Sequence, residues 1–179
     1  MTDDEALVAA LAVVQARGAI GGRSLTEAVA HSDRFVDLIP SGLISVADLG
    51  SGGGLPALVI AVRRADAMVT MIERRATRAD LLRRAITSLG LGERVTVLNL
   101  DAEVVCERAP RAFDIVTARS FSDPLTTARF IDRLLADGGI GLISEPPQDR
   151  THAWETALVG LPELLDDGVY QGIRRLRRP

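Results

Sequence analysis

Apolar residues follow two spacings in turn along the chain, and this alternation predicts the order of strands and helices. Short continuous apolar runs, which are typical of buried strands, cover residues 44–49, 68–72, 95–100, 113–118 and 140–144. The stretches between them are predicted to be helical, over residues 56–62, 76–89 and 123–135. Strands joined by helices form right-handed crossovers, so we expect a mostly parallel sheet with helices on both faces.

The two ends of the chain differ from this core. Residues 1–43 predict two helices separated by glycines, and the pairs Thr2 with Glu5 and Ser24 with Glu27 have the capping-box spacing that marks helix starts. Toward the other end, residues 137–139 predict a turn that closes a helix, residues 151–165 a helix, and residues 169–176 one further strand. The arginine-rich residues 174–178 suit either phosphate contact or a solvated sheet edge.

Length and composition limit the function classes. A chain of 179 residues predicts a single domain, with helices over 1–43 and an α/β core over 44–179. The net charge of −3 argues against a surface that coats nucleic acid, so any such contact is expected to be local. With one cysteine, an acidic start and no apolar run of about 18 residues, we expect a soluble cytoplasmic protein without membrane contact. No spaced His, Cys and Asp cluster suggests a metal site.

The strand over residues 44–49 leads into the pattern Asp48-x-Gly50-x-Gly52-x-Gly54, in which glycine recurs at every second position. Glycine permits a tight turn and lets a ligand approach the backbone, while the N–H groups of the following helix favour a polar or anionic group. The turn therefore predicts a nucleotide-like cofactor, with Ser51 and Leu55 completing the candidate loop. A glycine-rich turn without a ligand is the plain alternative.

Polar residues also follow the next three predicted strands, where ligands bind in parallel sheets. Glu73 comes about 20 residues after the glycine turn, the separation at which an acid contacts ribose hydroxyls. Asp101 is placed to accept from an adenine amine, and Ala102 leaves room for the ring; Glu103 is a further cofactor candidate. Arg119 ends the following strand. Helix capping by either acid and a surface salt bridge of Arg119 are the structural alternatives.

The glycine pattern also distinguishes between cofactors. A dinucleotide pattern beginning at Gly50 fails at Leu55, and one beginning at Gly52 fits only in the weaker form that ends at Ala57. The spacing from Asp48 to Gly54 resembles the first motif of class I methyltransferases, which bind S-adenosylmethionine. A nucleotide-dependent oxidoreductase stays open as an alternative function.

A longer set of motifs narrows the resemblance. The chain resembles the RsmG family, also called glucose-inhibited division protein B, over about residues 28–143. The shared stretches are residues 47–56, Ile72-Glu73, Thr77-Arg78 with Leu81-Leu82, Ala102-Glu103, and residues 113–121, which end in Ala-Arg-Ser-Phe. This resemblance implies a class I methyltransferase fold, S-adenosylmethionine as cofactor, and methylation of N7 of a guanosine in 16S ribosomal RNA within the small subunit.

The resemblance also implies roles for individual residues. Gly50, Gly52 and Gly54 would line the methionine part of the cofactor, Glu73 the ribose, and Asp101 with Ala102 the adenine. Arg119 would lie at the edge of the active site, facing the substrate, as the candidate catalytic residue.

The chain departs from the family pattern around the predicted substrate site. The family's Trp-Asn and Asn-Leu-Thr motifs are absent, and only His31 matches its Arg-His pair, so we expect His31 to be a partly buried helix residue rather than a catalytic one. Glu145-Pro146-Pro147 replaces a lysine-glycine step, which predicts a reversed charge that disfavours RNA phosphate. Methylation of a small molecule, or cofactor binding without turnover, are therefore alternative functions.

Overall fold

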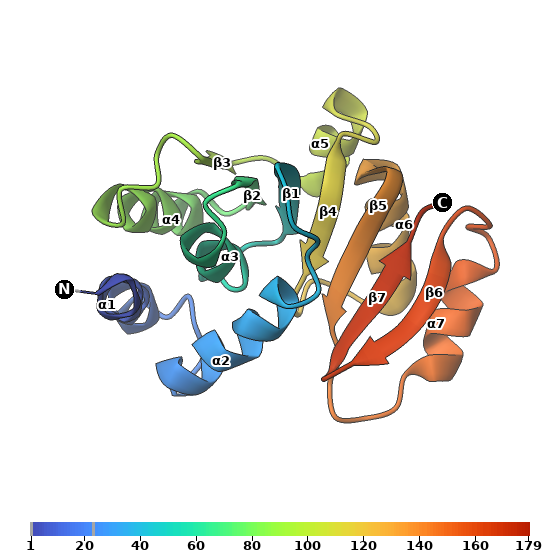
Figure 1. The fold of residues 1–179 in the computed structure, drawn as a ribbon, viewed down its shortest axis with the longest axis horizontal. Coiled ribbons are helices and arrows are strands. Elements are labelled where there is room, and N and C mark those ends of the chain that lie inside the picture. Colours follow the sequence, from blue (N-terminus) through green and yellow to red (C-terminus); the bar gives the residue numbers. More distant parts are fainter. Residues whose placement is uncertain (1, 23) are drawn as a thin grey trace.

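A seven-stranded sheet forms the centre of the protein, in a computed structural model that describes residues 2–22 and 24–179 (Figure 1). The strand order is β3-β2-β1-β4-β5-β7-β6, and the first five strands of this order are parallel. The last two pair antiparallel, β7 with β5 and β6 with β7. The strands are β1 (Ile44–Leu49), β2 (Ala67–Ile72), β3 (Val95–Leu98), β4 (Phe113–Ala118), β5 (Leu135–Ser144), β6 (Leu165–Tyr170) and β7 (Ile173–Arg177).

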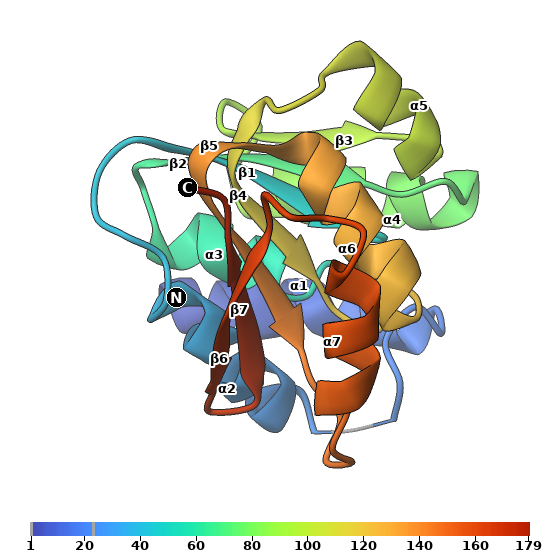
Figure 2. The ribbon, with the colours of Figure 1, turned by 90° about the vertical axis from the view of Figure 1, so that its right-hand side faces the viewer.

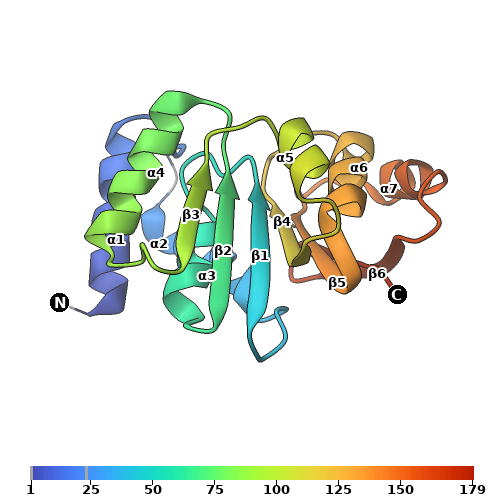
Figure 3. The ribbon, with the colours of Figure 1, turned by 90° about the horizontal axis from the view of Figure 1, so that it is seen from above.

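Helices cover both faces of the sheet, as predicted (Figures 2 and 3). Neighbouring residues of one strand point to opposite faces, so Val46 packs with α1 to α4, whereas Ala47 packs with α5 to α7. The helices are α1 (Asp3–Ala16), α2 (Leu25–Val36), α3 (Ala57–Arg63), α4 (Ala76–Ser88), α5 (Ala102–Arg108), α6 (Pro124–Leu134) and α7 (Thr151–Leu158). None of these helices, within the part of the chain that the structure describes, is long and apolar enough to cross a membrane.

The two predicted helix caps differ in outcome. Thr2 and Glu5 form the complete capping box of α1, in which each side chain accepts from the other residue's backbone N–H. The prediction for Ser24 and Glu27 is wrong, because the Ser24 side chain makes no capping hydrogen bond. Helix α2 begins at the predicted place and is held instead by its buried face, which includes Phe35.

The prediction of one strand over residues 169–176 is also wrong, because this segment is a hairpin. Gln171 and Gly172 have positive φ values of 51° and 80°, and they form a two-residue turn between β6 and β7. The fold therefore has both closing strands. β6, rather than the arginine-rich β7, lies at the sheet edge.

Two helices in the second half of the chain end earlier than the sequence predicts. Residues 137–139 do not close a helix: α6 ends at Leu134, and β5 begins directly at Leu135 with these residues inside it. They lie in a bulge, since Phe113 pairs with Leu135 whereas Ile115 pairs with Ile140. The helix predicted over 151–165 ends at Leu158, after which the chain turns toward β6.

Candidate cofactor and acceptor site

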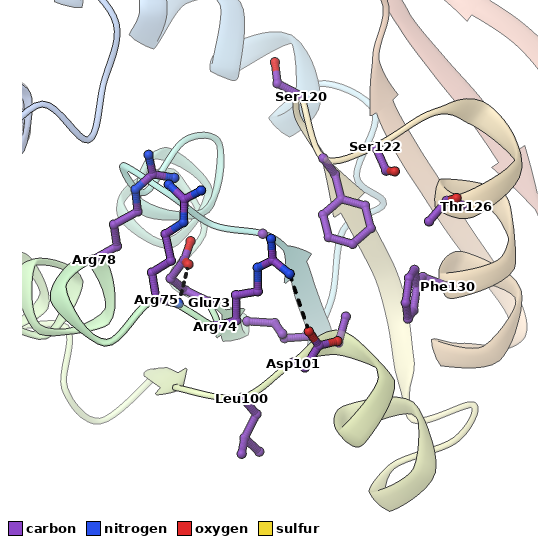
Figure 4. Close-up of a pocket in the computed structure, with 14 residues that line it drawn as sticks. Glu73, Arg74, Arg75, Arg78, Leu100, Asp101, Ser120, Ser122, Thr126 and Phe130 are labelled. Atoms are coloured by element: carbon purple, nitrogen blue, oxygen red, sulfur yellow. Dashed lines mark hydrogen bonds and ion pairs between the residues drawn. The ribbon is translucent and has the colours of Figure 1, made fainter.

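Three cavities meet at the carboxyl ends of β1 to β5, where parallel sheets bind ligands. The first has a volume of about 480 Å³ and lies at the ends of β1, β2 and β3 (Figure 4). It combines two carboxylates, three arginines, small polar groups and apolar surface. Its lining residues are Gly50, Ile72, Glu73, Arg74, Arg75, Arg78, Leu100, Asp101, Ala102, Ser120, Phe121, Ser122, Thr126 and Phe130.

The glycine turn lines the first cavity and also a third cavity, which has a volume of about 240 Å³. Gly50, Gly52 and Gly54 have φ values of 64°, 52° and 91°, a region that side chains other than glycine rarely adopt. A Cβ at Gly50 would lie 2.7 Å from the ring of Phe121. Gly50 lines both cavities, while Gly52, Ser51 and Leu55 line only the third. The turn therefore brings bare backbone to both spaces.

Glu73 connects the glycine turn to the end of β2. Its Oε2 accepts from the Gly52 N–H at 2.9 Å, and its Oε1 accepts from the Arg75 N–H at 2.8 Å. The side chain lines the first cavity, and the residue is 3% exposed, so it is not an exposed helix cap. Each carboxylate oxygen has a second lone pair that can accept from a ligand hydroxyl.

Asp101 caps a helix, as its structural alternative predicts, and it also lies in the lining of the first cavity. Its side chain caps α5 by accepting from the Glu103 N–H at 3.1 Å, and it also lines the first cavity beside Ala102. Figure 4 shows Arg74 reaching toward Asp101, with 3.9 Å between the charged atoms.

Glu103 lies outside the first cavity, unlike its neighbours in the predicted set. It lines a separate cavity between α5 and α6, where its carboxylate pairs with Arg133. The sequence placed Glu103 beside Asp101, but the first turn of α5 directs the two side chains to different sides.

Asp48 lies beneath the turn rather than in a cavity wall. It is 1% exposed, and Thr117 Oγ1 on β4 donates to its Oδ1 at 2.6 Å. Burial raises the pKa of Asp48 from 3.8 to about 6, although the hydrogen bond from Thr117 and the charge of Arg119 act in the opposite direction. Asp48 therefore links β1 to β4 below the site.

A second cavity, of about 790 Å³, adjoins the first along Ser120, Phe121 and Ser122. Arg119 lines this cavity and the third one but not the first, which Glu73 and Asp101 line. His31 lines it too, as a half-buried residue of α2, and its Nε2 is 2.9 Å from Oγ of Ser144 at the end of β5.

Glu145, where the sequence predicts a reversed charge, lines the second cavity. The Glu145 side chain is 7% exposed, and Nε of Arg174 donates to its Oε1 at 2.7 Å. Asp166 pairs with the same guanidinium, so one positive charge is shared between two carboxylates. Arg34 and Arg150, in contrast, contribute positive charge to the lining of the second cavity.

The arginine-rich end is not a solvated edge. Arg174 and Arg178 are 3% and 2% exposed and pair with carboxylates, while Arg175 and Arg177 both pair with Asp167. These arginines hold the hairpin to the rest of the fold instead of presenting a surface for phosphates.

Sequence reasoning missed two parts of the site. The first is the arginine rim, which we define as Arg74, Arg75 and Arg78. The arginine-rich run that follows Glu73 in the sequence could have indicated positive charge at this cavity. The second is the stretch of residues 19–21, after α1, which packs on the glycine turn, with Ala19 and Ile20 lining the third cavity. Among residues 2–22 and 24–179 there is no group of three metal-ligating side chains.

Comparison with known proteins now assigns the family. Residues 14–154 match the GidB family, described as rRNA small subunit methyltransferase G. The chain belongs to this family. A ribosomal RNA small subunit methyltransferase G of Laribacter hongkongensis is 35% identical over 99 residues, which cover 52% of this chain and 44% of that protein. One of Salinispora arenicola is 35% identical over 157 residues, which cover 82% of this chain and 63% of that protein. The chain spans about half the length of the curated relatives it matches.

The fold has relatives among solved structures. A SAM-dependent O-methyltransferase of Thermotoga maritima superposes with a TM-score of 0.62 at 21% identity, covering 82% of this chain and 58% of that one. The predicted Rossmann-like methyltransferase fold is therefore confirmed.

Proposed function

We propose that this chain is an S-adenosylmethionine-dependent methyltransferase whose acceptor is N7 of a guanosine in small-subunit ribosomal RNA. The observation that carries the proposal is the contact between two cavities along Ser120, Phe121 and Ser122. One cavity suits the cofactor, and the other offers space for an acceptor base. The family match over residues 14–154 supports the same reaction.

The residues of the first and third cavities fit S-adenosylmethionine. Gly50 offers backbone without a Cβ, Glu73 and Asp101 offer acceptors for hydroxyl and amino groups, and Phe121 and Phe130 offer apolar surface. Gly52, in the third cavity, would face the methionine end. When bound, this cofactor supplies an electrophilic methyl group.

The acceptor chemistry asks little of the protein beyond positioning. Guanine N7 has a lone pair at neutral pH, so its methylation needs orientation and exclusion of water more than a general base. Phe121, between the cavities, would exclude water, and Arg119 would hold the acceptor against the cofactor. A ribosomal RNA acceptor would locate the reaction in the cytoplasm.

A labelled-methyl assay tests this proposal. The protein is incubated with radiolabelled S-adenosylmethionine and, separately, with small subunits lacking the modification, with total RNA and with a small-molecule extract. We expect label in 16S RNA, at a guanosine located by nuclease digestion and mass spectrometry. If only a small metabolite is labelled, that metabolite rather than RNA is the acceptor. Tight cofactor binding without any methyl transfer would indicate a binding module.

A further inference from the structure

Charged side chains are distributed unevenly between the first and third cavities. The first cavity is lined by the carboxylates of Glu73 and Asp101, which accept hydrogen bonds and cannot donate them when ionised. The third cavity is lined by Arg78 and Arg119 and, among the residues that the structure describes, by no carboxylate. A ligand that spans both cavities is therefore expected to place hydroxyl and amino groups in the first and an anionic group in the third.

Arg78 differs from the rest of the arginine rim in its position. It lines both the first and the third cavity, whereas Arg74 and Arg75 line only the first. Its side chain extends from the first turn of α4 to the glycine turn, where a Cβ at Gly52 would lie 3.8 Å from Nη1 of Arg78 (Figure 4). The residue is half-buried, so the guanidinium borders the passage between the two cavities and stays within reach of a ligand.

The positive charge of Arg78 has no protein partner in the part of the chain that the structure describes, where no carboxylate forms an ion pair with it. Arg119, the other cation of the third cavity, interacts with the buried Asp48, whose pKa burial raises and the charge of Arg119 lowers. A cation in the first turn of a helix is also unfavourable, because the helix dipole is positive there, and the first turn of α4 contains no acidic residue. An anion bound at Arg78 would offset both costs.

We propose that Arg78 binds the carboxylate of the cofactor's methionine and makes the site selective for ligands that carry this group. The inference rests on the cofactor of the proposed function and not on its RNA acceptor. A guanidinium offers two parallel N–H donors that match the two oxygens of a carboxylate. The adenosine part of the cofactor has hydroxyl and amino groups, which suit Glu73 and Asp101 in the first cavity. The charges of the two cavities thus direct the two ends of the cofactor to different places.

Decarboxylated S-adenosylmethionine tests the inference without altering the protein, because it keeps the nucleoside, the sulfonium and the amine and lacks only the carboxylate. Calorimetry with the full chain, in the absence of RNA, measures Kd for this ligand and for S-adenosylmethionine. Loss of a charge-assisted pair should weaken wild-type binding by about tenfold or more. Equal affinities for the two ligands overturn the inference, and absence of binding by both overturns the cofactor assignment together with it. A failed RNA methylation assay alongside a tenfold difference in binding overturns the acceptor alone.

Variant Arg78→Ala tests the residue with the same two ligands. We expect the preference for S-adenosylmethionine over its decarboxylated form to fall below about threefold, because the carboxylate loses its partner. Arg78→Lys should keep part of the preference, since an ammonium group retains the charge but lacks the paired donors of a guanidinium.

The matched control is Arg74→Ala, which removes the same charge from the first cavity only and should keep the full preference. A general effect of positive charge would lower the preference equally in Arg74→Ala and Arg78→Ala, and that result overturns the role of Arg78. A full preference in Arg78→Ala overturns it as well. If Arg78→Ala does not fold, Arg78→Gln, which keeps a long polar side chain without the charge, is measured in its place.

Discussion

Asp48 shows how one residue of the glycine motif combines a structural role with an electrostatic cost. Its carboxylate is buried at the end of β1 and is held by Thr117 from β4. The pKa rises from 3.8 to about 6, so the folded state binds this proton more tightly than the unfolded chain does. The contribution of Asp48 to the free energy of unfolding is therefore most favourable below pH 4, and it falls as the pH rises from 4 to 6.

Variant Asp48→Asn removes this ionisation and keeps an oxygen that can accept from Thr117. The pKa change corresponds to roughly 3 kcal/mol at neutral pH, so we expect the free energy of unfolding at pH 7.5 to rise by about 1–3 kcal/mol. The gain should vanish near pH 4. Urea unfolding at both pH values measures it, and an equal gain at both would show that ionisation is not the cause.

Glu73 and Glu103 are two carboxylates that the sequence assigned to the cofactor and that the fold separates. Because Glu73 lines the first cavity, Glu73→Ala should weaken S-adenosylmethionine binding by about 1.5–3 kcal/mol. Glu103→Ala is the control and should leave binding unchanged, since Glu103 pairs with Arg133 in another cavity. Calorimetry with the cofactor compares them, and unchanged affinity in Glu73→Ala removes Glu73 from the site.

Arg119 lines the second cavity, where we propose that the acceptor binds. We expect Arg119→Ala to leave cofactor affinity within about threefold and to lower methyl transfer at least tenfold, a loss of about 1.4 kcal/mol or more in transition-state stabilisation. Arg129→Ala, which alters a residue of the separate cavity between α5 and α6, is the control. Single-turnover transfer and calorimetry separate the two effects; a loss confined to cofactor affinity would assign Arg119 to the cofactor alone.

The stretch of residues 19–21, which is neither helix nor strand, shows how a loop completes the site. It lies against the glycine turn so closely that a Cβ at Gly53 would be 2.2 Å from Ile20 Cγ1 and 2.7 Å from the Ala19 carbonyl oxygen. Gly53 is thus required for close approach rather than for a positive φ. This stretch thereby lines the third cavity.

Variant Gly53→Ala should therefore displace this segment. We expect a loss of about 1–3 kcal/mol in the free energy of unfolding, as for other overpacked positions, together with weaker cofactor binding. Gly92→Ala is the matched control, because nothing lies within 4 Å of its added Cβ. Denaturant unfolding of both variants measures the difference; equal stability of the two would mean that the segment moves aside without cost.

At the scale of the whole molecule, the net charge of −3 does not describe the surface around the site. The arginine rim borders the first cavity, and Arg34 and Arg150 line the second. Acidic residues gather elsewhere, for example at residues 3–5 of α1. Local positive charge is therefore compatible with an acidic protein.

This distribution predicts a limited electrostatic contribution to RNA binding. We expect a log–log plot of RNA affinity against salt to correspond to about two to four phosphate contacts. Replacing Arg74 and Arg75 by alanine should reduce that number by about one or two, whereas the same change at Arg111 and Arg129 should not. A wild-type slope near zero would exclude phosphate contacts of the arginine rim.

The sequence by itself determined the features that depend on neighbouring residues. The strand, the glycine turn and the helix after Asp48 form where predicted, because positive φ at alternate glycines and apolar runs act within a few residues. The same holds for the positions of Glu73, Asp101 and Arg119 at strand ends, since the crossover rule places the carboxyl ends of parallel strands at one edge.

Only the tertiary structure decided which charges are buried and which line a cavity. Glu145 and Arg174 are 29 residues apart, and their pairing requires the hairpin that places β7 beside β5. Likewise, Glu103 turns toward Arg133 because α5 packs on α6, although it follows Asp101 closely in the chain. Sequence patterns report local conformation, but burial and ion pairing depend on which distant segments meet, and that is fixed only when the sheet and its helices are assembled.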